Sequence, residues 1–227
     1  MILSNKQILH EIRRENIKIS GLTGDEEPDK APFNTTAVDL KLSSKIYIPK
    51  KNALAVDLRN EKLKVTELLE SNCEPISLHE KTPFILNTGD FILATTKEEV
   101  EFPIDRKPFF AARIEGKSSN ARCGLTVHCT APTIHAGFKG PITLEISNLS
   151  TWPFLLHPNM YICQLIIEEV NGDIEKKISQ FHGQNSATGK SLYQDQDQNQ
   201  EQIEQIVERM LKKYTEQEKM KVKPRKK

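Results

Sequence analysis

The feature that most constrains the fold is a series of short apolar segments between residues 37 and 170. Segments such as VDLKL, PFILN, DFILATT, LTVHCTA and PITLEISN are separated by Gly, Pro, Asn or Asp. Several of them alternate apolar and polar residues, which is the pattern of a strand with one buried face. Regular spacing of this kind is typical of an all-β barrel or sandwich, and disfavours alternating strands and helices. We therefore predict a mainly β domain.

The N-terminus carries the signals of a short helix. Ser4, followed three residues later by Gln7, has the pattern of a capping box. Leu3 and Ile8 are placed as a hydrophobic staple around it. We expect this helix to end near Asn16.

The composition changes near residue 178, where the strand pattern stops. We expect a β domain over residues 1–178, followed by a small, polar and mobile arm over residues 179–191. Residues 192–227 begin as a low-complexity polar stretch, continue as an amphipathic helix and end in a basic tail. This helix packs on its own domain or on a neighbouring subunit in one interpretation. In the other, it binds a separate partner.

Composition also limits the class of protein. The chain has 227 residues and a formal charge of +1, which fits one substantial domain with an appendage and gives no overall basic field for nucleic acid. No apolar run approaches the ~18 residues of a transmembrane helix. The N-terminus becomes charged at once, without the apolar core of a signal peptide. Because the four cysteines form no C-x-x-C pair, we expect free thiols in a cytoplasmic protein with no membrane association.

Two known functional motifs are incomplete in this sequence. GQNSATGKS resembles a phosphate-binding P-loop, but Gly183 and Gly189 enclose five residues instead of four, and no buried strand leads into them. Zinc deaminases need clustered His, Glu and Cys ligands, whereas this chain offers isolated pairs such as His128-Cys129. The sequence therefore predicts neither a P-loop nor a zinc site.

The segment from Glu115 to Asn148 holds the densest polar chemistry. The turn GKSSNAR, residues 116–122, offers two cations, two hydroxyls and free turn amides, a combination that suits a polyanion. The strand GPITLEISN then carries Glu145 in its middle, where an ionised carboxylate is unfavourable unless a function needs it. A solvated turn and a charge-paired strand glutamate are the structural alternatives.

These pieces, together with MILSNKQI, TAVDLKL, GFKGPITLEISN and HPNMYICQL, resemble the dCTP deaminase family, which shares a superfamily with trimeric dUTPases. The resemblance runs in the family's order from residue 1 to about 190. It implies a distorted β-barrel of the dUTPase-like (β-clip) type, to which this chain adds a C-terminal helical extension. It also implies a homotrimer with active sites shared between subunits. The implied reaction is zinc-independent hydrolytic deamination of dCTP to dUTP and ammonia, with Mg²⁺ bound through the triphosphate.

The resemblance assigns roles to single residues. Glu145 matches the catalytic glutamate, which takes a proton from the water attacking C4 of cytosine and passes it to N3 and the leaving amine. Ser118 and Arg122 match nucleotide-binding residues that also orient this water. Lys117 stands where the family has a phosphate-binding cation.

Other matches surround the pyrimidine and the arm. Thr143 and Leu144 fall at backbone positions beside the base, and Gln184 matches a nucleotide-contacting residue of the family's C-terminal lid. The predicted nucleotide-binding set is Lys117, Ser118, Ser119, Asn120, Ala121, Arg122, Ala131, His135, Thr143, Leu144, Glu145 and Gln184.

Three positions depart from the family pattern. His135 stands where an aspartate is usual, and in dUTPases this aspartate serves the water that attacks the phosphate chain. Phe138 replaces a tyrosine of dUTPases. Gln180 replaces a phosphate-binding lysine, a contact that Lys190 is placed to take over. Because imidazole is a poor copy of a carboxylate base at neutral pH, His135 disfavours a dUTPase, and Phe138 also favours a deaminase.

Two other functions stay open on the sequence. One is a dUTPase, or a bifunctional dCTP deaminase and dUTP diphosphatase. The other is a non-catalytic dNTP-binding regulatory module, in which the C-terminal helix and basic tail contact an unidentified partner.

Overall fold

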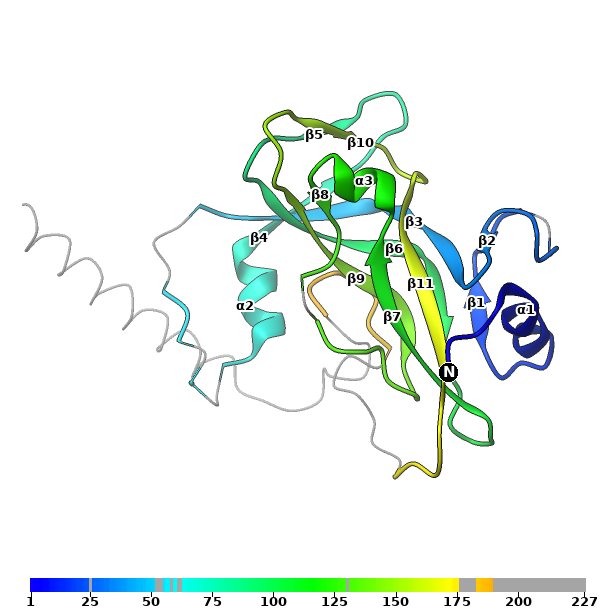
Figure 1. Cartoon of the computed structure of the whole chain (residues 1–227). Coiled ribbons are helices and arrows are strands. Elements are labelled where there is room, and N and C mark those ends of the chain that lie inside the picture. Colours follow the sequence, from blue (N-terminus) through cyan, green and yellow to red (C-terminus); the bar gives the residue numbers. More distant parts are fainter. Residues whose placement is uncertain are drawn as a thin grey trace, which may run out of the picture.

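The folded part of the chain is built around one large antiparallel sheet (Figure 1). The computed structural model describes residues 1–24, 26–51, 55–57, 59–60, 63–129, 131–175 and 183–189. The predicted C-terminal helix, the basic tail and the expected boundary at residue 178 lie outside these residues. Within them, no helix is long and apolar enough to cross a membrane.

The main sheet has nine strands, curls into a nearly closed barrel and confirms the predicted mainly β architecture. Its path runs through β7 (Phe109–Gly116), β11 (Tyr161–Val170), β3 (Ala37–Pro49), β6 (Phe91–Glu101), β9 (Lys139–Asn148) and β8 (Leu125–Thr126). Three short strands attach to this path, namely β1 (Lys18–Ser20) on β6, and β2 (Phe33–Asn34) and β4 (Cys73–Ser77) on β3. A separate pair is formed by β5 (Phe84–Leu86) and β10 (Phe154–Leu156).

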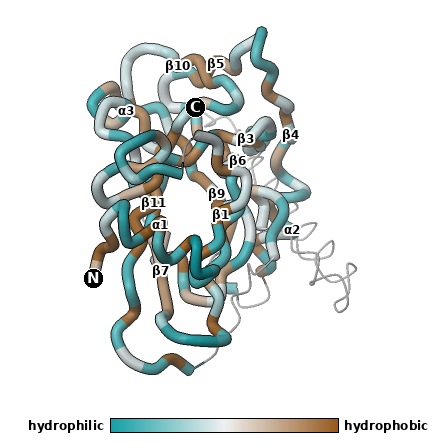
Figure 2. The backbone as a smooth tube through the Cα atoms, turned by 90° about the vertical axis from the view of Figure 1, so that its right-hand side faces the viewer, coloured by the Kyte–Doolittle hydropathy of each residue, from teal (hydrophilic) through white to brown (hydrophobic). Residues whose placement is uncertain are grey.

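Strand β9 has the alternation that its sequence predicts. Ile142, Leu144 and Ile146 are buried in the core, and the intervening Thr143 and Glu145 are half-buried on the other face. Full burial of each such aliphatic side chain contributes about 1.5–3 kcal/mol. In Figure 2, hydrophobic stretches lie along β9 and β11.

The barrel is closed by a contact between an edge strand and a loop. Ala112 of β7 and Ile134 exchange two backbone hydrogen bonds, with N···O distances of 2.9 and 2.7 Å. This bridge joins β7 to the segment that leads into β9. The loop from Ala131 to Phe138 is thereby held against the barrel opening.

Helix α1 (Asn5–Arg13) confirms the predicted capping box, in which the Ser4 and Gln7 side chains each bond the other's backbone N–H. Ile8 is fully buried in the core. The helix ends before the expected Asn16 because Glu15 has a left-handed backbone, with φ of 58°. A right-handed helix cannot continue through such a residue.

Two further helices lie on the barrel surface. Helix α2 (Val65–Asn72), which was not predicted, has no buried residue and lies on the opposite side of the barrel from α1 (Figure 1). Helix α3 (Ser118–Arg122) is one short turn directly after β7. It lies at the end of the barrel where β5 and β10 are found (Figure 1).

Candidate functional site

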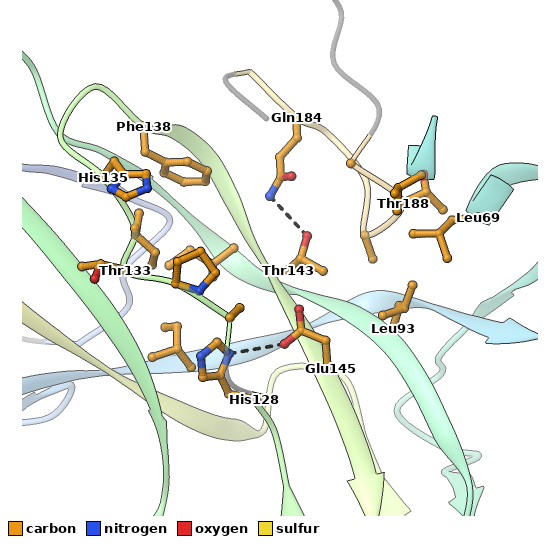
Figure 3. Close-up of a pocket in the computed structure, with 18 of the residues that line it drawn as sticks. Leu69, Leu93, His128, Thr133, His135, Phe138, Thr143, Glu145, Gln184 and Thr188 are labelled. Carbon is orange, nitrogen blue, oxygen red and sulfur yellow. Dashed lines mark hydrogen bonds and ion pairs between the residues drawn. The ribbon is translucent and has the colours of Figure 1, made fainter. Parts of the chain in front are cut away.

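A cavity of about 540 Å³ opens on the half-buried face of β9 (Figure 3). Its walls come from β9, the loop before it, α2 and the segment 183–189. Figure 3 shows His135 and Phe138 on one side of the cavity and Leu69 and Leu93 on the other. The lining residues are Val65, Leu69, Phe91, Leu93, Ile114, His128, Ala131, Pro132, Thr133, Ile134, His135, Phe138, Ile142, Thr143, Glu145, Gln184, Ala187, Thr188 and Gly189.

Glu145 is the one carboxylate among the described lining residues. It points into the cavity together with Thr143, because residues two apart on a strand share a face (Figure 3). Leu93 lies directly opposite Glu145 on the neighbouring strand β6. The carboxylate is therefore carried by a strand that is paired with β6 and lies beside an apolar neighbour, which limits its freedom to move.

Two groups from the chain after β8 approach the Glu145 carboxylate. His128 Nδ1 lies 3.3 Å from Glu145 Oε2, and the Cys129 backbone N–H donates to the same oxygen at 3.4 Å. The His128 nitrogen makes no well-aligned hydrogen bond, so this contact is an ion pair only when the imidazole is protonated. Both side chains are about three-quarters buried, at 22% and 24% exposure. The carboxylate is thus held on one side and open to the cavity on the other.

The segment 183–189 docks on β9 and covers part of the cavity. Gly183 N–H donates to Lys139 O at 2.9 Å. The Gln184 side chain donates to Pro141 O at 2.7 Å and to the Thr143 hydroxyl at 3.2 Å (Figure 3). Gln184, which the resemblance assigns to the nucleotide, therefore lies at the edge of the cavity.

A glycine makes this close approach possible. Gly140 has φ of +137°, and a Cβ there would lie 2.8 Å from Gln184 O. No other residue type fits this backbone without moving the segment. Ala187 of the same segment is buried against Leu93 and Leu69, so the docked segment also touches the strand opposite Glu145.

The polar turn predicted to bind the nucleotide lies elsewhere in the single chain. Ser118, Ser119 and Arg122 are exposed on α3, and none of them lines the cavity. Lys117 is likewise outside the cavity, where its Nζ pairs with Asp39 Oδ2 at 2.5 Å. Asn120 and Ala121 share this location on α3.

The predicted set therefore divides into two groups and one core residue. The cavity brings together Ala131, His135, Thr143, Glu145 and Gln184. Leu144 has a fully buried side chain in the barrel core, so only its backbone is available to a ligand.

His128, Val65 and Leu69 are among the lining residues that sequence reasoning did not assign to the site. His128 was considered only as half of an isolated pair with Cys129. Its place two residues beyond Thr126 of β8, the strand paired with β9, brings it to Glu145. Val65 and Leu69 come from α2, whose short apolar pattern gave no helix prediction. The available signal was the helical spacing of apolar residues within LKVTELLESN, where Val65, Leu68 and Leu69 stand at positions i, i+3 and i+4.

Comparisons with known proteins agree with this fold. The family described as dCTP deaminase-like matches residues 2–170. A protein of Methanosphaera stadtmanae named "dCTP deaminase, dUMP-forming" is 36% identical over 175 residues, covering 77% of this chain and 82% of the relative. One of Halorubrum lacusprofundi named "dCTP deaminase" is 33% identical over 197 residues, covering 87% of this chain and 88% of the relative.

A solved structure shares the fold. It is the 2′-deoxycytidine 5′-triphosphate deaminase of Agrobacterium tumefaciens, with a TM-score of 0.56 and 21% identity. The match covers 75% of this chain and 49% of that one. The resemblance read from the sequence is confirmed by the family match and the two relatives together. The chain belongs to the dCTP deaminase-like family.

Proposed function

We propose that this chain hydrolytically deaminates dCTP, with Glu145 as the group that moves the protons. The observation that carries the proposal is the single carboxylate of the cavity, fixed on β9 and approached by His128 and the Cys129 N–H. The names of the relatives support dCTP as the substrate.

The chemistry needs one proton carrier beside C4 of the base. Glu145 takes a proton from water while the water oxygen forms a bond to C4, and the proton passes to N3. Glu145 then takes the second proton of the former water and delivers it to the exocyclic amine. The C4–N bond breaks, ammonia leaves, and a C4 carbonyl remains. One water is consumed for each ammonia released, so the atoms balance.

A second copy of the chain completes the site in this proposal. Among the described residues that line the cavity there is no Lys or Arg, although a triphosphate carries several negative charges. The exposed Ser118, Ser119 and Arg122 of α3 are chemically suited to these phosphates and to the attacking water. We infer a homotrimer in which α3 of one subunit meets the Glu145 cavity of the next.

The proposal uses Mg²⁺ as a companion of the nucleotide and uses no zinc. Among the described residues, no group of three or more His, Cys, Asp or Glu side chains converges as a protein metal site. This donor set does not fit a resident zinc ion, which requires such a group. Mg²⁺ held by phosphate oxygens supplies neutralisation of the triphosphate charge. Lys117 and Arg122 bind the remaining anionic oxygens.

We propose dUTP as the product, because His135 offers an imidazole where hydrolysis of the phosphate chain calls for a carboxylate base. A second candidate is the bifunctional reaction, in which dUTP is cleaved further to dUMP. The specific observation that favours it is that several relatives are named "dCTP deaminase, dUMP-forming".

One assay tests both candidates. The full chain is incubated with dCTP and Mg²⁺, and nucleotides and ammonia are followed by chromatography and an enzymatic ammonia assay. The proposal expects equal amounts of dUTP and ammonia. Ammonia with dUMP and pyrophosphate identifies the bifunctional enzyme. A chain that binds dCTP and releases no ammonia contradicts the deaminase proposal and identifies the binding module.

A further inference from the structure

The cavity on β9 has two chemically different sides, and Glu145 lies between them. Figure 3 shows His128 and His135 to one side of Glu145, and Leu69 and Leu93 to the other. One side therefore offers groups that form hydrogen bonds, and the other offers hydrocarbon. The proposed reaction assigns a role to Glu145 and leaves the second side without one.

The second side is built by β6 and α2. Leu93 lies directly opposite Glu145 in the register of β6 and β9, and Phe91 shares the face of Leu93 because it is two residues away. Val65 and Leu69 stand four residues apart on α2, on the same face of the helix. We call Val65, Leu69, Phe91 and Leu93 the apolar side, since none of these side chains can form a hydrogen bond. Val65 and Phe91 are 47% and 41% exposed, so the apolar side opens to solvent at that end.

The segment that docks on β9 covers the apolar side with hydrocarbon. Ala187 is 2% exposed and shares a buried cluster with Leu93, against which Leu69 packs. Thr188 also lines the cavity, and its hydroxyl is engaged with the Ser186 hydroxyl at 2.8 Å. The space beside Leu69 and Leu93 is therefore partly enclosed and largely apolar.

We propose that the apolar side receives the leaving amine, and that the chain therefore also deaminates dCTP that carries a small alkyl group on this amine. The inference rests on the proposed function, in which C4 of the base lies beside Glu145. When the pyrimidine ring lies toward His135 and Phe138, the C4–N bond, which is in the ring plane, points toward Leu93. An N–H facing this side finds no side-chain acceptor, whereas a methyl group there is buried against Leu69 and Leu93.

The reaction of N4-methyl-dCTP follows the course proposed for dCTP. Glu145 takes a proton from water while the water oxygen bonds to C4, and the proton passes to N3. Glu145 then delivers the second proton of the former water to the methylated nitrogen. The C4–N bond breaks, its electron pair leaves with methylamine, and a C4 carbonyl remains. One water is consumed for each methylamine released, so the atoms balance.

A pair of substrates tests the inference on the full chain with Mg²⁺. Methylamine is measured by chromatography after derivatisation, and any ammonia formed from N4-methyl-dCTP reveals contaminating dCTP. We expect kcat/KM for N4-methyl-dCTP to lie within about tenfold of that for dCTP, because the added methyl group enters an apolar space. A site whose buried polar groups bind both amine hydrogens rejects the methylated amine by about 10⁴-fold. A loss of more than about 10²-fold therefore overturns the inference.

Variants of α2 test whether the alkyl group lies on the apolar side. Leu69→Phe fills this space and is expected to lower the ratio of kcat/KM for N4-methyl-dCTP to kcat/KM for dCTP by about tenfold. Leu69→Ala enlarges the space and is expected to raise the same ratio for N4-propyl-dCTP by about tenfold. Leu68→Phe is the matched control, because Leu68 is the neighbouring residue on α2 and does not line the cavity.

Circular dichroism shows whether each variant is folded. If Leu69→Phe does not fold, Leu69→Ala and the substrate pair still decide the question. The inference is overturned by ratios that do not respond to the folded Leu69 variants, or that change equally in Leu68→Phe.

The outcomes separate this inference from the proposed function. Release of ammonia from dCTP without methylamine from N4-methyl-dCTP removes the inference and leaves the deaminase in place. If neither nucleotide is converted, the proposed function fails and the inference fails with it. Conversion of both nucleotides with the expected response of the Leu69 variants supports both.

Discussion

Helix α3 and the β9 cavity are close in sequence and chemically opposite. Ser118 and Arg122 of α3 offer exposed hydroxyl and cationic groups that lie outside the cavity. The cavity offers a fixed carboxylate, Glu145, and no Lys or Arg among its described lining residues. A reaction on a nucleoside triphosphate needs both kinds of group, and each region holds the kind that the other lacks. In the proposed homotrimer, two copies of the chain bring these two surfaces together.

Glu145→Gln removes the proton carrier from the cavity side and gives the largest expected effect. The amide keeps the shape of the side chain and still accepts from the Cys129 N–H, but it cannot move protons. We expect kcat for dCTP deamination to fall by about 10²–10⁴-fold, with nucleotide binding retained. Steady-state kinetics and calorimetry with dCTP measure the two quantities. Turnover within a few fold of the wild type removes the assigned role.

Arg122→Ala removes the cation from the α3 side. We expect kcat/KM to fall by about 10²-fold, because in the proposed site the guanidinium contacts phosphate and orients the water. Arg59→Ala is the control, since Arg59 is 91% exposed and pairs only with Asp57 in the described structure. If the two variants have equal kinetics, α3 does not take part in the site.

Gln184→Ala sharpens the comparison within the cavity half. It removes the donor to Pro141 O and to the Thr143 hydroxyl, so the segment 183–189 docks less firmly. We expect KM to rise by about tenfold with a smaller change in kcat, together with faster proteolysis after this segment. Thr143→Val loses only one of the two contacts and is expected to show a smaller effect. Unchanged proteolysis and KM in Gln184→Ala contradict the docked position.

Glu98→Gln is expected to give the smallest effect, a change in the pH dependence of stability. It tests the barrel that carries both α3 and the cavity. Burial raises the pKa of the Glu98 carboxyl above its ordinary 4.5, against the hydrogen bond from Lys41 N–H and the charges of Lys41 and Lys97. The stability from this group is present below the ordinary value and is lost as the pH rises through the raised pKa.

Glutamine has no such dependence, so the variant is expected to gain stability relative to the wild type as the pH rises. Urea unfolding at acidic, neutral and mildly alkaline pH measures the difference. A difference that is flat with pH, or that shrinks toward alkaline pH, contradicts the buried charge.

Local patterns predicted the elements that local physics determines. Two examples are the Ser4 and Gln7 capping box and the alternation of β9. Each depends on only a few neighbouring residues, and both are confirmed. The family resemblance extended this to the barrel. It also assigned Glu145, Thr143 and Gln184 to the nucleotide; the three residues line one cavity, and their binding of a nucleotide stays a prediction.

The rest depended on contacts between distant parts of the chain. His128 reaches Glu145 because β8 pairs with the end of β9, a register that its own segment does not encode. Helix α2 has no side-chain cap and no buried residue, so its sequence carries only a weak helix signal. The role of its apolar residues Val65 and Leu69 is to line the cavity, which forms only in the folded chain. The separation of α3 from the cavity appeared only in three dimensions.

The most direct test of the two-surface account mixes two inactive variants. Glu145→Gln supplies intact α3, and Arg122→Ala supplies an intact cavity. When the two are dissociated, mixed in equal amounts and reassembled, random assortment gives about a quarter of the sites both wild-type halves. The account predicts recovery of about a quarter of wild-type dCTP deamination from variants that are inactive alone. A mixed assembly of confirmed composition with no recovered activity contradicts it, because Glu145 and Arg122 then act within one chain.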